Sequence, residues 1–495
     1  MKLHKTILTV LLLALIIPLS AQKKETAKAD AMFNNQDYYN AVDEYKNAYI
    51  KIKDKKEKAE VVFKIAECYR YMSEYRQAEL WYRKAVKVKY DDPIAYYYLA
   101  EARKINGDYE KAMETFKEYI KLVPDDPRGK NGLKSCELAQ KWTSKPTRHE
   151  VMNMAYFNER QADFSPCFGK DEDEVYFTSA RPGAEGNKIN PVTGQYYTDI
   201  FLSKKDRKGT WSEPNMEEVG EFVNSEYDEG AATLDDRGST IYFTRCDYDK
   251  KNVQPCQIYT AGKRGTSFGE EELIEFFPGN DSVSVGHPAL ASDGETLYFV
   301  ANNAPGGFGG RDIWMSKKPG RSDPWGEPVN LGPEINTPGD ELYPFAHVSG
   351  DIYFASNYHI GMGGLDIFKA SKDENDNWTI ENLKYPINSS YDDFGIIFEG
   401  EAEKGYFTST RPGGKGNEDI YRFVLPPLNF SIEGVVRDEK TDELLEGVTV
   451  RLHGSDGTTV ESVTEKDGAF KFILKPSTDY KYETIKQGYL KGTGQ

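Results

Sequence analysis

Two glycine-rich segments are the first candidates for ligand chemistry in this sequence. Residues 306–312 and 413–419 both place Gly-Gly-x-Gly before an aspartate, which is Asp312 in one and Asp419 in the other. Calcium-binding nonapeptides share this pattern, but they work in immediate tandem, whereas these two copies lie far apart. A dinucleotide-binding fingerprint needs a following helix, and no helical period follows either copy. We therefore expect the glycines to permit tight turns and each aspartate to bind turn amides, with no metal or cofactor.

The sequence offers no convincing set of catalytic residues. A peptidase-type hydrolase needs a Gly-x-Ser-x-Gly elbow between a strand and a helix, followed by an aspartate and a histidine, and we expect no such elbow here. Residues 203–211 resemble the Asp-box hairpin of sialidases, with Asp206, Gly209 and Trp211 in place. Asp-boxes are structural turns, and no arginine cluster accompanies this one. We predict a protein that is not an enzyme.

Five cysteines give one candidate disulfide. Cys246 and Cys256 bracket a single loop between two predicted strands, so they are placed to pair in an oxidising compartment. The alternative is that these two, with Cys68, Cys136 and Cys167, are all separate small hydrophobic residues. No spacing of cysteine and histidine resembles a zinc site.

The N-terminus has the three parts of an export signal, over residues 1–21. Lys2 and Lys5 supply the positive end, residues 7–17 the apolar centre, and residues 18–21 a break that ends in a small residue. The apolar centre is about half of a bilayer-spanning helix, so cleavage is favoured over anchorage. No other stretch is apolar enough to span a membrane, so we expect an exported, soluble mature protein.

Charge divides the mature chain into two parts. Residues 22–145 hold 26 Lys and Arg against 21 Asp and Glu, a net charge of +5, and the remainder carries −24. An acidic body disfavours nucleic acid as a partner, because that binding depends on neutralising phosphates with Lys and Arg. The basic part suits an acidic partner or is simply a solvated surface.

A helical repeat occupies residues 22–145. Ala41, Ala78 and Ala112 occur at spacings of 37 and 34 residues, and each is followed four residues later by an aromatic residue. Neighbouring helix pairs of this kind stack because one pair cannot bury its own apolar face. The pattern resembles three tetratricopeptide repeats with a polar capping helix near residues 128–141.

Such a stack is concave on the side of its first helices, which is where a segment of another protein is expected to bind. Placing the inner-face positions of the repeat on this sequence predicts a partner-binding set of Phe63, Glu67, Arg70, Tyr97, Glu101 and Lys104. The alternative is that these are ordinary helix-surface residues.

A second repeat fills residues 146–427. Five Tyr-Phe pairs start at residues 176, 242, 298, 353 and 406, and a second strand start such as Asp366-Ile367-Phe368 follows each of them. Short aromatic strands at this period predict radial four-stranded blades. The last unit lacks its outer strand, so we expect residues 150–157 to complete it and close a five-bladed propeller. Six blades is the alternative.

The units resemble the PD-type blades of WD-like propellers, whose mouths bind peptides, proteins or sugars. Loops before the second strands predict a ring on one propeller face made of Arg181, Arg311, His359 and Arg411. The alternative is that Arg181 and Arg411, each followed by Pro-Gly, only form turns.

Residues 428–495 alternate as a small sandwich does, for example over residues 448–452 and 470–472. This part resembles an immunoglobulin-like carboxypeptidase-regulatory-like domain, and it is short enough that we expect it to be incomplete. The fold class is therefore a multidomain α + β chain: α-solenoid, all-β propeller and β-sandwich.

The order of these parts resembles the OmpA-family periplasmic proteins of type IX secretion and gliding motility (PorE-like). That resemblance implies a non-catalytic periplasmic adaptor, associated with the outer membrane, that binds other envelope proteins. It also implies peptidoglycan binding through a following OmpA-like domain, which this sequence does not contain. The alternative function is a receptor for carbohydrate or peptidoglycan fragments at the propeller mouth.

Overall fold

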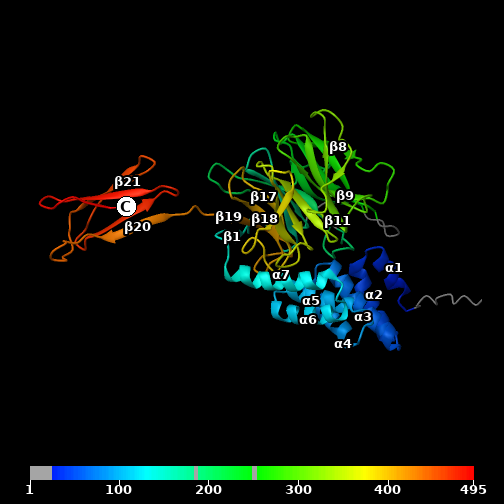
Figure 1. Cartoon of the computed structure of the whole chain (residues 1–495). Helices are drawn as coiled ribbons and strands as arrows, with labels where there is room; N and C mark the ends of the chain where they lie inside the picture. Colours follow the sequence, from blue (N-terminus) through cyan, green and yellow to red (C-terminus); the bar gives the residue numbers. More distant parts are fainter. Residues whose placement is uncertain (1–24, 183–187, 248–253, 495) are drawn as a thin grey trace, which may run out of the picture. The chain divides into compact units, whose positions relative to one another are not determined.

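The computed structural model describes residues 25–182, 188–247 and 254–494 (Figure 1). The expected export signal, residues 1–21, lies outside the described residues. The chain forms two compact units that divide after Val424. In the part that the structure describes, no helix has the length and the apolar character needed to cross a membrane.

Seven helices form the N-terminal part of the first unit, which we call the arm. They are α1 (Ala27–Asn34), α2 (Tyr38–Lys51), α3 (Lys55–Tyr71), α4 (Tyr75–Lys87), α5 (Ile94–Ile105), α6 (Tyr109–Leu122) and α7 (Pro127–Ser144). The three repeat alanines, Ala41, Ala78 and Ala112, are fully buried where neighbouring helices approach. The first six helices therefore stack as three pairs, with α7 packed against the last pair.

The turn inside each helix pair has the same backbone shape. Gln36, Ser73 and Gly107 take the left-handed conformation there, with φ of 59°, 58° and 81°. In the first and third pairs the next residue, Asp37 or Asp108, caps the second helix by accepting a backbone N–H bond. These three turns form a row along one edge of the arm.

Five antiparallel sheets complete the first unit. Their strands are β2 (Asp163–Phe168), β3 (Glu174–Ser179) and β4 (Asp199–Lys204); β5 (Asp228–Leu234), β6 (Thr240–Cys246), β7 (Gln257–Arg264) and β8 (Ser267–Ile274); β9 (Ser284–Leu290), β10 (Thr296–Asn302), β11 (Arg311–Lys317) and β12 (Val329–Asn330); β13 (Glu341–Ala346), β14 (Ile352–Ser356), β15 (Asp366–Lys372) and β16 (Trp378–Asn382); and β17 (Asp393–Phe398), β18 (Lys404–Ser409) and β19 (Asp419–Val424) with β1 (Glu150–Asn153).

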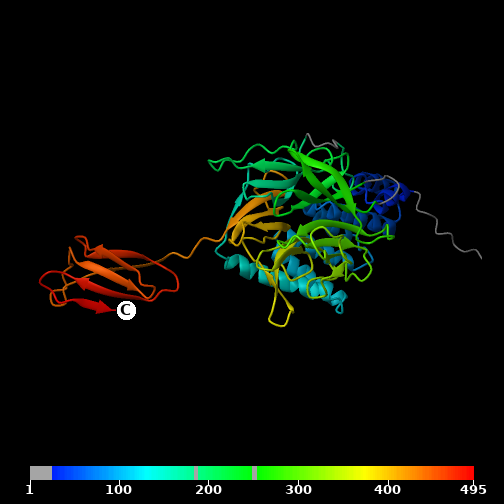
Figure 2. The same ribbon diagram turned by 90° about the horizontal axis from the view of Figure 1, so that it is seen from above.

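The five sheets are arranged around a common centre, and we call them the five-sheet ring. The first strands contact one another in the cyclic order β2, β5, β9, β13, β17 and back to β2. Figure 2 shows the same sheets from above. Each Tyr-Phe pair lies on the second strand of a sheet, and all five of its phenylalanines are buried.

The segment before the first sheet joins the last one. β1 pairs antiparallel with β19, and Val151 lies opposite Phe423. This strand ends at Asn153 rather than at residue 157, because the chain then turns into the ring. There Phe157 is fully buried and the Asn158 side chain bonds to the backbone of Ile420.

Every first strand carries a bulge. At each bulge one residue takes the left-handed conformation, with φ between 44° and 61°: Ser165, Ala231, His287, Tyr343 and Gly395. Four of the five are not glycine, so the backbone is strained there. Strain of this kind at four equivalent places is typical of functional sites and lies here at the centre of the ring.

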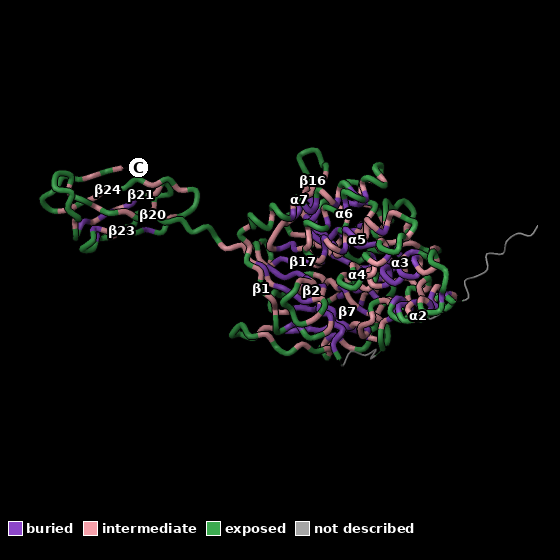
Figure 3. The backbone as a smooth tube through the Cα atoms, turned by 90° about the horizontal axis from the view of Figure 1, so that it is seen from below, coloured by how far each residue is buried: buried purple, intermediate pink, exposed green. Residues whose placement is uncertain are grey.

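The second unit has two antiparallel sheets. β20 (Phe430–Val435) pairs with β23 (Ala469–Leu474), and the other sheet has the order β22 (Thr459–Val463), β21 (Thr449–Gly454), β24 (Tyr480–Ile485) and β25 (Gly492–Gly494). Its core is small and centres on Val450, Leu452 and Phe472. Figure 3 shows that most of its chain is exposed or intermediate.

Candidate functional site

In three sheets, an arginine at or just after the end of the second strand forms an ion pair with a carboxylate at the start of the first strand. We call these three ion pairs the clamps. The distances between guanidinium nitrogen and carboxylate oxygen are 2.6 Å in all three, which are Arg181–Asp163, Arg245–Glu229 and Arg411–Asp393. The three carboxylate side chains are completely buried. Each arginine also donates to a backbone carbonyl before the first strand, for example Arg411 to Pro386 at 2.8 Å.

The clamps change the interpretation of the predicted ring of basic residues. Arg181 and Arg411 are enclosed in clamps, so they hold loops in place and do not present charge on the face. His359 has a related position, since its Nε2 lies 2.8 Å from the Ile335 carbonyl oxygen and burial lowers its pKa. Of the four predicted residues, only Arg311 is half exposed, 3.4 Å from Asp340. Arg245 was not among the predicted residues. At its position on the second strand, three of the other sheets have a serine, so no repeated pattern marks it.

The glycine-rich loops are held by aspartates that bind turn amides. The Asp312 side chain accepts the Phe308 N–H at 2.6 Å, and Asp419 accepts the amides of Lys415 and Gly416. Asp366 does the same for Met362 and Gly363. In the described part of the chain, no group of His, Cys, Asp and Glu is placed to hold a metal ion. These aspartates therefore act as turn-binding residues.

One Gly-x-Ser-x-Gly string does occur, at residues 265–269. It lies in the hairpin between β7 and β8, with Ser267 at the start of β8 and Phe268 buried against the neighbouring sheet. A nucleophile elbow joins a strand to a helix. The hairpin therefore gives Ser267 none of the surroundings of a catalytic serine.

The predicted concave face of the arm is largely closed. Glu67 is 8% exposed and accepts bonds from Arg70, at 2.7 Å, and from the Tyr82 hydroxyl. Phe63 stacks on Tyr90 with ring centres 4.4 Å apart. These residues satisfy one another within the arm, so they do not form an open surface for a partner.

The other three predicted residues face the ring. Glu101 and Lys104 pair at 2.8 Å, and Lys104 is only 5% exposed. With Tyr97 they line a very small pocket whose far side is formed by the ring residues Asn357, Tyr358 and His359. This end of the inner face is thus covered by the ring of the same chain.

The arm docks on the ring by its row of turns. The Tyr39 N–H donates to the Pro191 carbonyl at 3.0 Å, beside the first turn. At the second turn Tyr75 bonds to Asp392, and at the third Tyr109 bonds to Ser390. Figure 1 shows the helices lying along one face of the sheets. The arm therefore covers the face of the ring that carries the clamps.

A cavity of about 410 Å³ lies between the arm and the ring centre. Asn35 and Gln36, at the first turn of the arm, line it on one side. All five sheets and their loops contribute to the rest of the wall, including Phe164, Asp228, His287, Tyr343, Phe394 and Glu418. The first turn of the arm is thus part of the wall, so a ligand in this cavity contacts both parts of the unit.

The floor of this cavity is a column of rings. His287 stacks on Tyr343 with centres 3.9 Å apart, Tyr343 stacks on Phe394 at 4.6 Å, and Phe164 meets Phe394 edge to face at 6.3 Å. The His287 Nδ1 accepts the Tyr343 N–H at 3.3 Å. Burial, with Arg311 nearby, lowers the pKa of His287 to about 3, so the ring is neutral at physiological pH.

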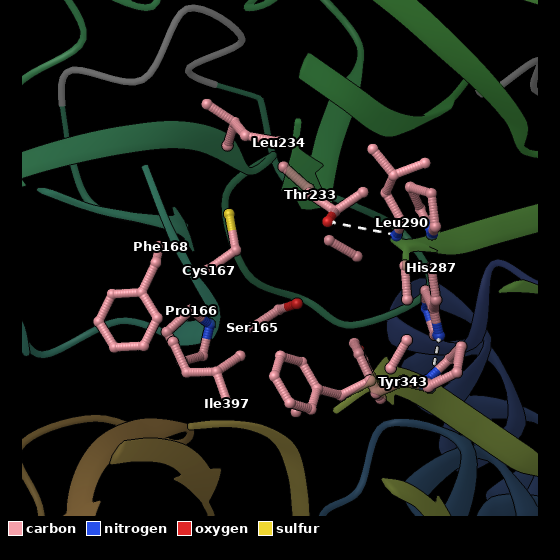
Figure 4. Close-up of a pocket in the computed structure, with 18 of the residues that line it drawn as sticks. Ser165, Pro166, Cys167, Phe168, Thr233, Leu234, His287, Leu290, Tyr343 and Ile397 are labelled. Atoms are coloured by element: carbon pink, nitrogen blue, oxygen red, sulfur yellow. Dashed lines mark hydrogen bonds between the residues drawn. The ribbon is translucent and has the colours of Figure 1, made fainter. Parts of the chain in front are cut away.

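On the other side of the floor lies a second pocket of about 260 Å³ (Figure 4). His287 and Tyr343 line both cavities, and Ser165 and Ile397 line only this one. The bulge residues His287 and Tyr343 therefore lie between the two cavities.

Four acidic residues line the arm-side cavity, and two of them, Asp228 and Glu418, lie outside the clamps and accept bonds from the loop of residues 190–198. Asp228 accepts the Thr198 N–H at 2.7 Å and a bond from Asn190, and Glu418 accepts from the Gln195 amide at 3.3 Å. Burial raises the pKa of both carboxyl groups to about 7. Neither has an ion pair with any residue that the structure describes. Sequence reasoning missed both of them, and also the ring column, because no motif marks them.

The structure joins Cys246 and Cys256 by a disulfide, and both residues line the arm-side cavity. Cys68, Cys136 and Cys167 are buried free thiols. The disulfide fixes one wall of the cavity at the end of β6 and the start of β7.

The chain matches no protein-family model and no curated protein. Similar solved structures include a glycoside hydrolase at 10% identity, covering 59% of this chain and 95% of its own, with a TM-score of 0.38. An α-L-arabinofuranosidase from Lactobacillus brevis has 13% identity, coverages of 55% and 92%, and a TM-score of 0.33. A tetratricopeptide domain from Arabidopsis has 23% identity, coverages of 24% and 96%, and a TM-score of 0.22. Such scores are too low to indicate a shared function.

Proposed function

We propose that this chain is a non-catalytic scaffold that binds protein partners in the bacterial envelope. In this proposal the arm is a tetratricopeptide domain, the five-sheet ring is a five-bladed propeller, and the second unit is a carboxypeptidase-regulatory-like sandwich. The observation that carries it is the cavity of about 410 Å³ that the arm and the ring enclose together. A preformed cavity shared by two parts of one unit is suited to holding a ligand.

Four of the ring carboxylates are held by loops of the ring, which favours a structural role for these four over a catalytic one. A glycosidase-like mechanism needs two carboxyl groups that reach the reacting bond, one of them as the acid. The carboxylates at the starts of β2, β5 and β17 are instead held in the clamps, and Glu341 at the start of β13 bonds to Thr337 and Ser356. All four position loops; of them, Glu229 lines the cavity from within its clamp, whereas Asp163, Glu341 and Asp393 do not line it.

Export to the periplasm and association with the outer membrane belong to the same proposal. The N-terminal pattern is that of an export signal, and the disulfide between Cys246 and Cys256 suits an oxidising compartment. The domain order resembles the periplasmic proteins of type IX secretion and gliding motility, so components of that machinery are the first partners to test.

Site-specific photo-crosslinking in the native envelope tests this function. A benzoylphenylalanine at Gln36, on the cavity wall, is expected to capture a defined envelope protein, whereas one at exposed Lys208 is not. Equal capture from both positions, or capture of nothing at Gln36, would exclude a partner at the cavity.

A carbohydrate or peptidoglycan fragment is the alternative occupant. The aromatic floor and the amides of Asn190 and Gln195 on the wall favour it, because sugars use such groups. Purified muropeptides that compete with crosslinking from Gln36, in the absence of any protein product, would favour this alternative.

A further inference from the structure

We propose that the arm-side cavity is a receptor for the side chain of an arginine carried by a partner protein. This inference rests on the proposed function, since it names the chemistry by which the scaffold recognises its partner. It is carried by three features: an aromatic floor, two carboxyl groups that form no ion pair with any described residue, and the net negative charge of the chain from residue 146 onwards.

The floor gives a bound cation a water-excluding surface. Tyr343, Phe394 and Phe164 line the cavity in one continuous column. His287 and Phe394 cover the two faces of Tyr343, so Phe394 and Phe164 are the rings that a cation can contact. Aromatic rings attract cations through their π electrons, and the planar guanidinium group of arginine is less strongly hydrated than the ammonium group of lysine. The apolar part of an arginine side chain also packs well against such rings.

Acidic residues on the wall of the cavity supply negative charge for the bound cation. Asp228, Glu418 and Asp247 all line the cavity. Burial raises the pKa of Asp228 and Glu418 to about 7, so a positive charge beside either carboxyl group favours its ionised form. An arginine supplies such a charge, and its five N–H donors fit carboxylate oxygens.

The basic residues near the cavity do not fill this role. Arg245 donates to Glu229 and Glu271, both at 2.6 Å, and is 9% exposed. Arg311 lines the cavity but is half exposed and lies beside Asp340. The chain from residue 146 onwards, which includes the ring and the second unit, carries a net charge of −24, and a net negative charge favours the approach of a basic segment.

The experiment is a calorimetric titration of the full chain with a capped peptide, acetyl-Gly-Gly-Arg-Gly-Gly-amide. The matched ligand has citrulline in place of arginine, which keeps the shape and removes the charge. We expect a dissociation constant of about 1 mM or tighter for the arginine peptide. For the citrulline peptide we expect binding about tenfold weaker, because the charge-dependent attraction is lost.

Variants locate the site. Glu418→Gln and Phe164→Leu are each expected to weaken the arginine peptide by about five- to tenfold, and Glu433→Gln on the second unit is expected to leave it unchanged. Thermal unfolding of each variant shows whether it is folded before the titration is interpreted.

Equal affinity for the two peptides, no binding of the arginine peptide, or unchanged binding in both cavity variants would each overturn the inference. Photo-crosslinking from Gln36 is read separately. If a protein partner is captured but the arginine peptide does not bind, the scaffold function stands and the arginine receptor is excluded.

Discussion

Neighbouring acidic residues of the ring have opposite surroundings. Three pairs show this: Asp228 and Glu229, Asp392 and Asp393, and Glu418 and Asp419. In each pair the second residue holds the ring together, either in a clamp or on turn amides. The first residue lines the cavity or bonds to the arm.

The difference arises from strand geometry. Each pair lies at the start of a strand, where successive side chains point in opposite directions. One carboxylate is therefore held by the loops or turns of its own sheet. Its neighbour lies on the side shared with the arm, where Asp228 and Asp392 also accept a backbone N–H from Thr198 and Leu365. Residue type alone does not separate a structural acid from a candidate binding acid, whereas position along the strand does.

Breaking a clamp is expected to have the largest effect. Arg411→Ala leaves Asp393 buried without its cation, so we expect the free energy of unfolding to fall by about 3–5 kcal/mol in urea titration. The control is Arg311→Ala, which removes a half-exposed arginine and is expected to cost less than about 1 kcal/mol. Equal losses of stability in Arg411→Ala and Arg311→Ala would show that the clamped acid of each acidic pair does not stabilise the ring.

Removing the disulfide is expected to have the second-largest effect on stability. Replacing Cys246 and Cys256 together by serine is expected to lower the free energy of unfolding by about 2–3 kcal/mol, because the unfolded chain gains freedom. Thiol reduction of the unmodified chain serves as the matched measurement and is expected to give the same loss. A loss confined to the serine variant would point to a packing defect instead.

Glu418 and Asp419, the acidic pair at the start of β19, test whether the two residues of such a pair have different roles. Asp419→Asn removes a charged acceptor of the Lys415 and Gly416 amides, so we expect a loss of about 1–2 kcal/mol in chemical unfolding. Glu418→Gln is expected to change stability by less than about 0.5 kcal/mol, because this residue does not hold the ring together. The reverse ranking would contradict the division of roles.

The smallest effect concerns pH at the arm–ring contact. Burial raises the pKa of Asp392 to about 6, although the Leu365 N–H, Tyr75 and Lys104 oppose this shift, while Asp393 reinforces it. A raised folded-state pKa contributes stability at low pH that is lost as the pH rises through about 6. Between pH 5 and pH 8 we expect this to lower the stability of the first unit by about 1 kcal/mol.

Asp392→Asn is the variant that isolates this contribution. Because asparagine does not titrate, the thermal midpoint of the variant is expected to fall less than that of the unmodified chain between pH 5 and pH 8. Glu418 titrates in both proteins; its pKa is raised by burial and also by Asp392, so the variant removes the Asp392 titration together with its effect on Glu418. Parallel pH profiles for the two proteins would remove Asp392 as the titrating group.

Much of the local structure could be predicted from spacing. Ala41, Ala78 and Ala112 indicated where helices approach, and the phenylalanines of the Tyr-Phe pairs indicated the buried second strands. The pairing of residues 150–153 with the last sheet followed from the strand missing there. Such features repeat along the chain, so they leave a signal in the sequence.

The candidate site could not be predicted in the same way. Arg181 and Arg411 were placed on a binding face, yet each lies in a clamp with an aspartate 18 residues away. The set from Phe63 to Lys104 was placed on an open concave surface, yet part of it is paired within the arm and part faces the ring. For Arg181 and Arg411 the alternative that they hold turns fits the structure better than the binding face. What covers a residue decides such cases, and periodicity does not report it.

The sequence by itself determined the repeats, their lengths and the turns between them, because local spacing and residue type govern helix pairs and short strands. Only the tertiary structure decided that the arm lies on the ring by its turns and that Asp228 and Glu418 share one cavity. Those facts depend on contacts between residues that are far apart along the chain. The local sequence around such a residue does not identify the residue that it will contact.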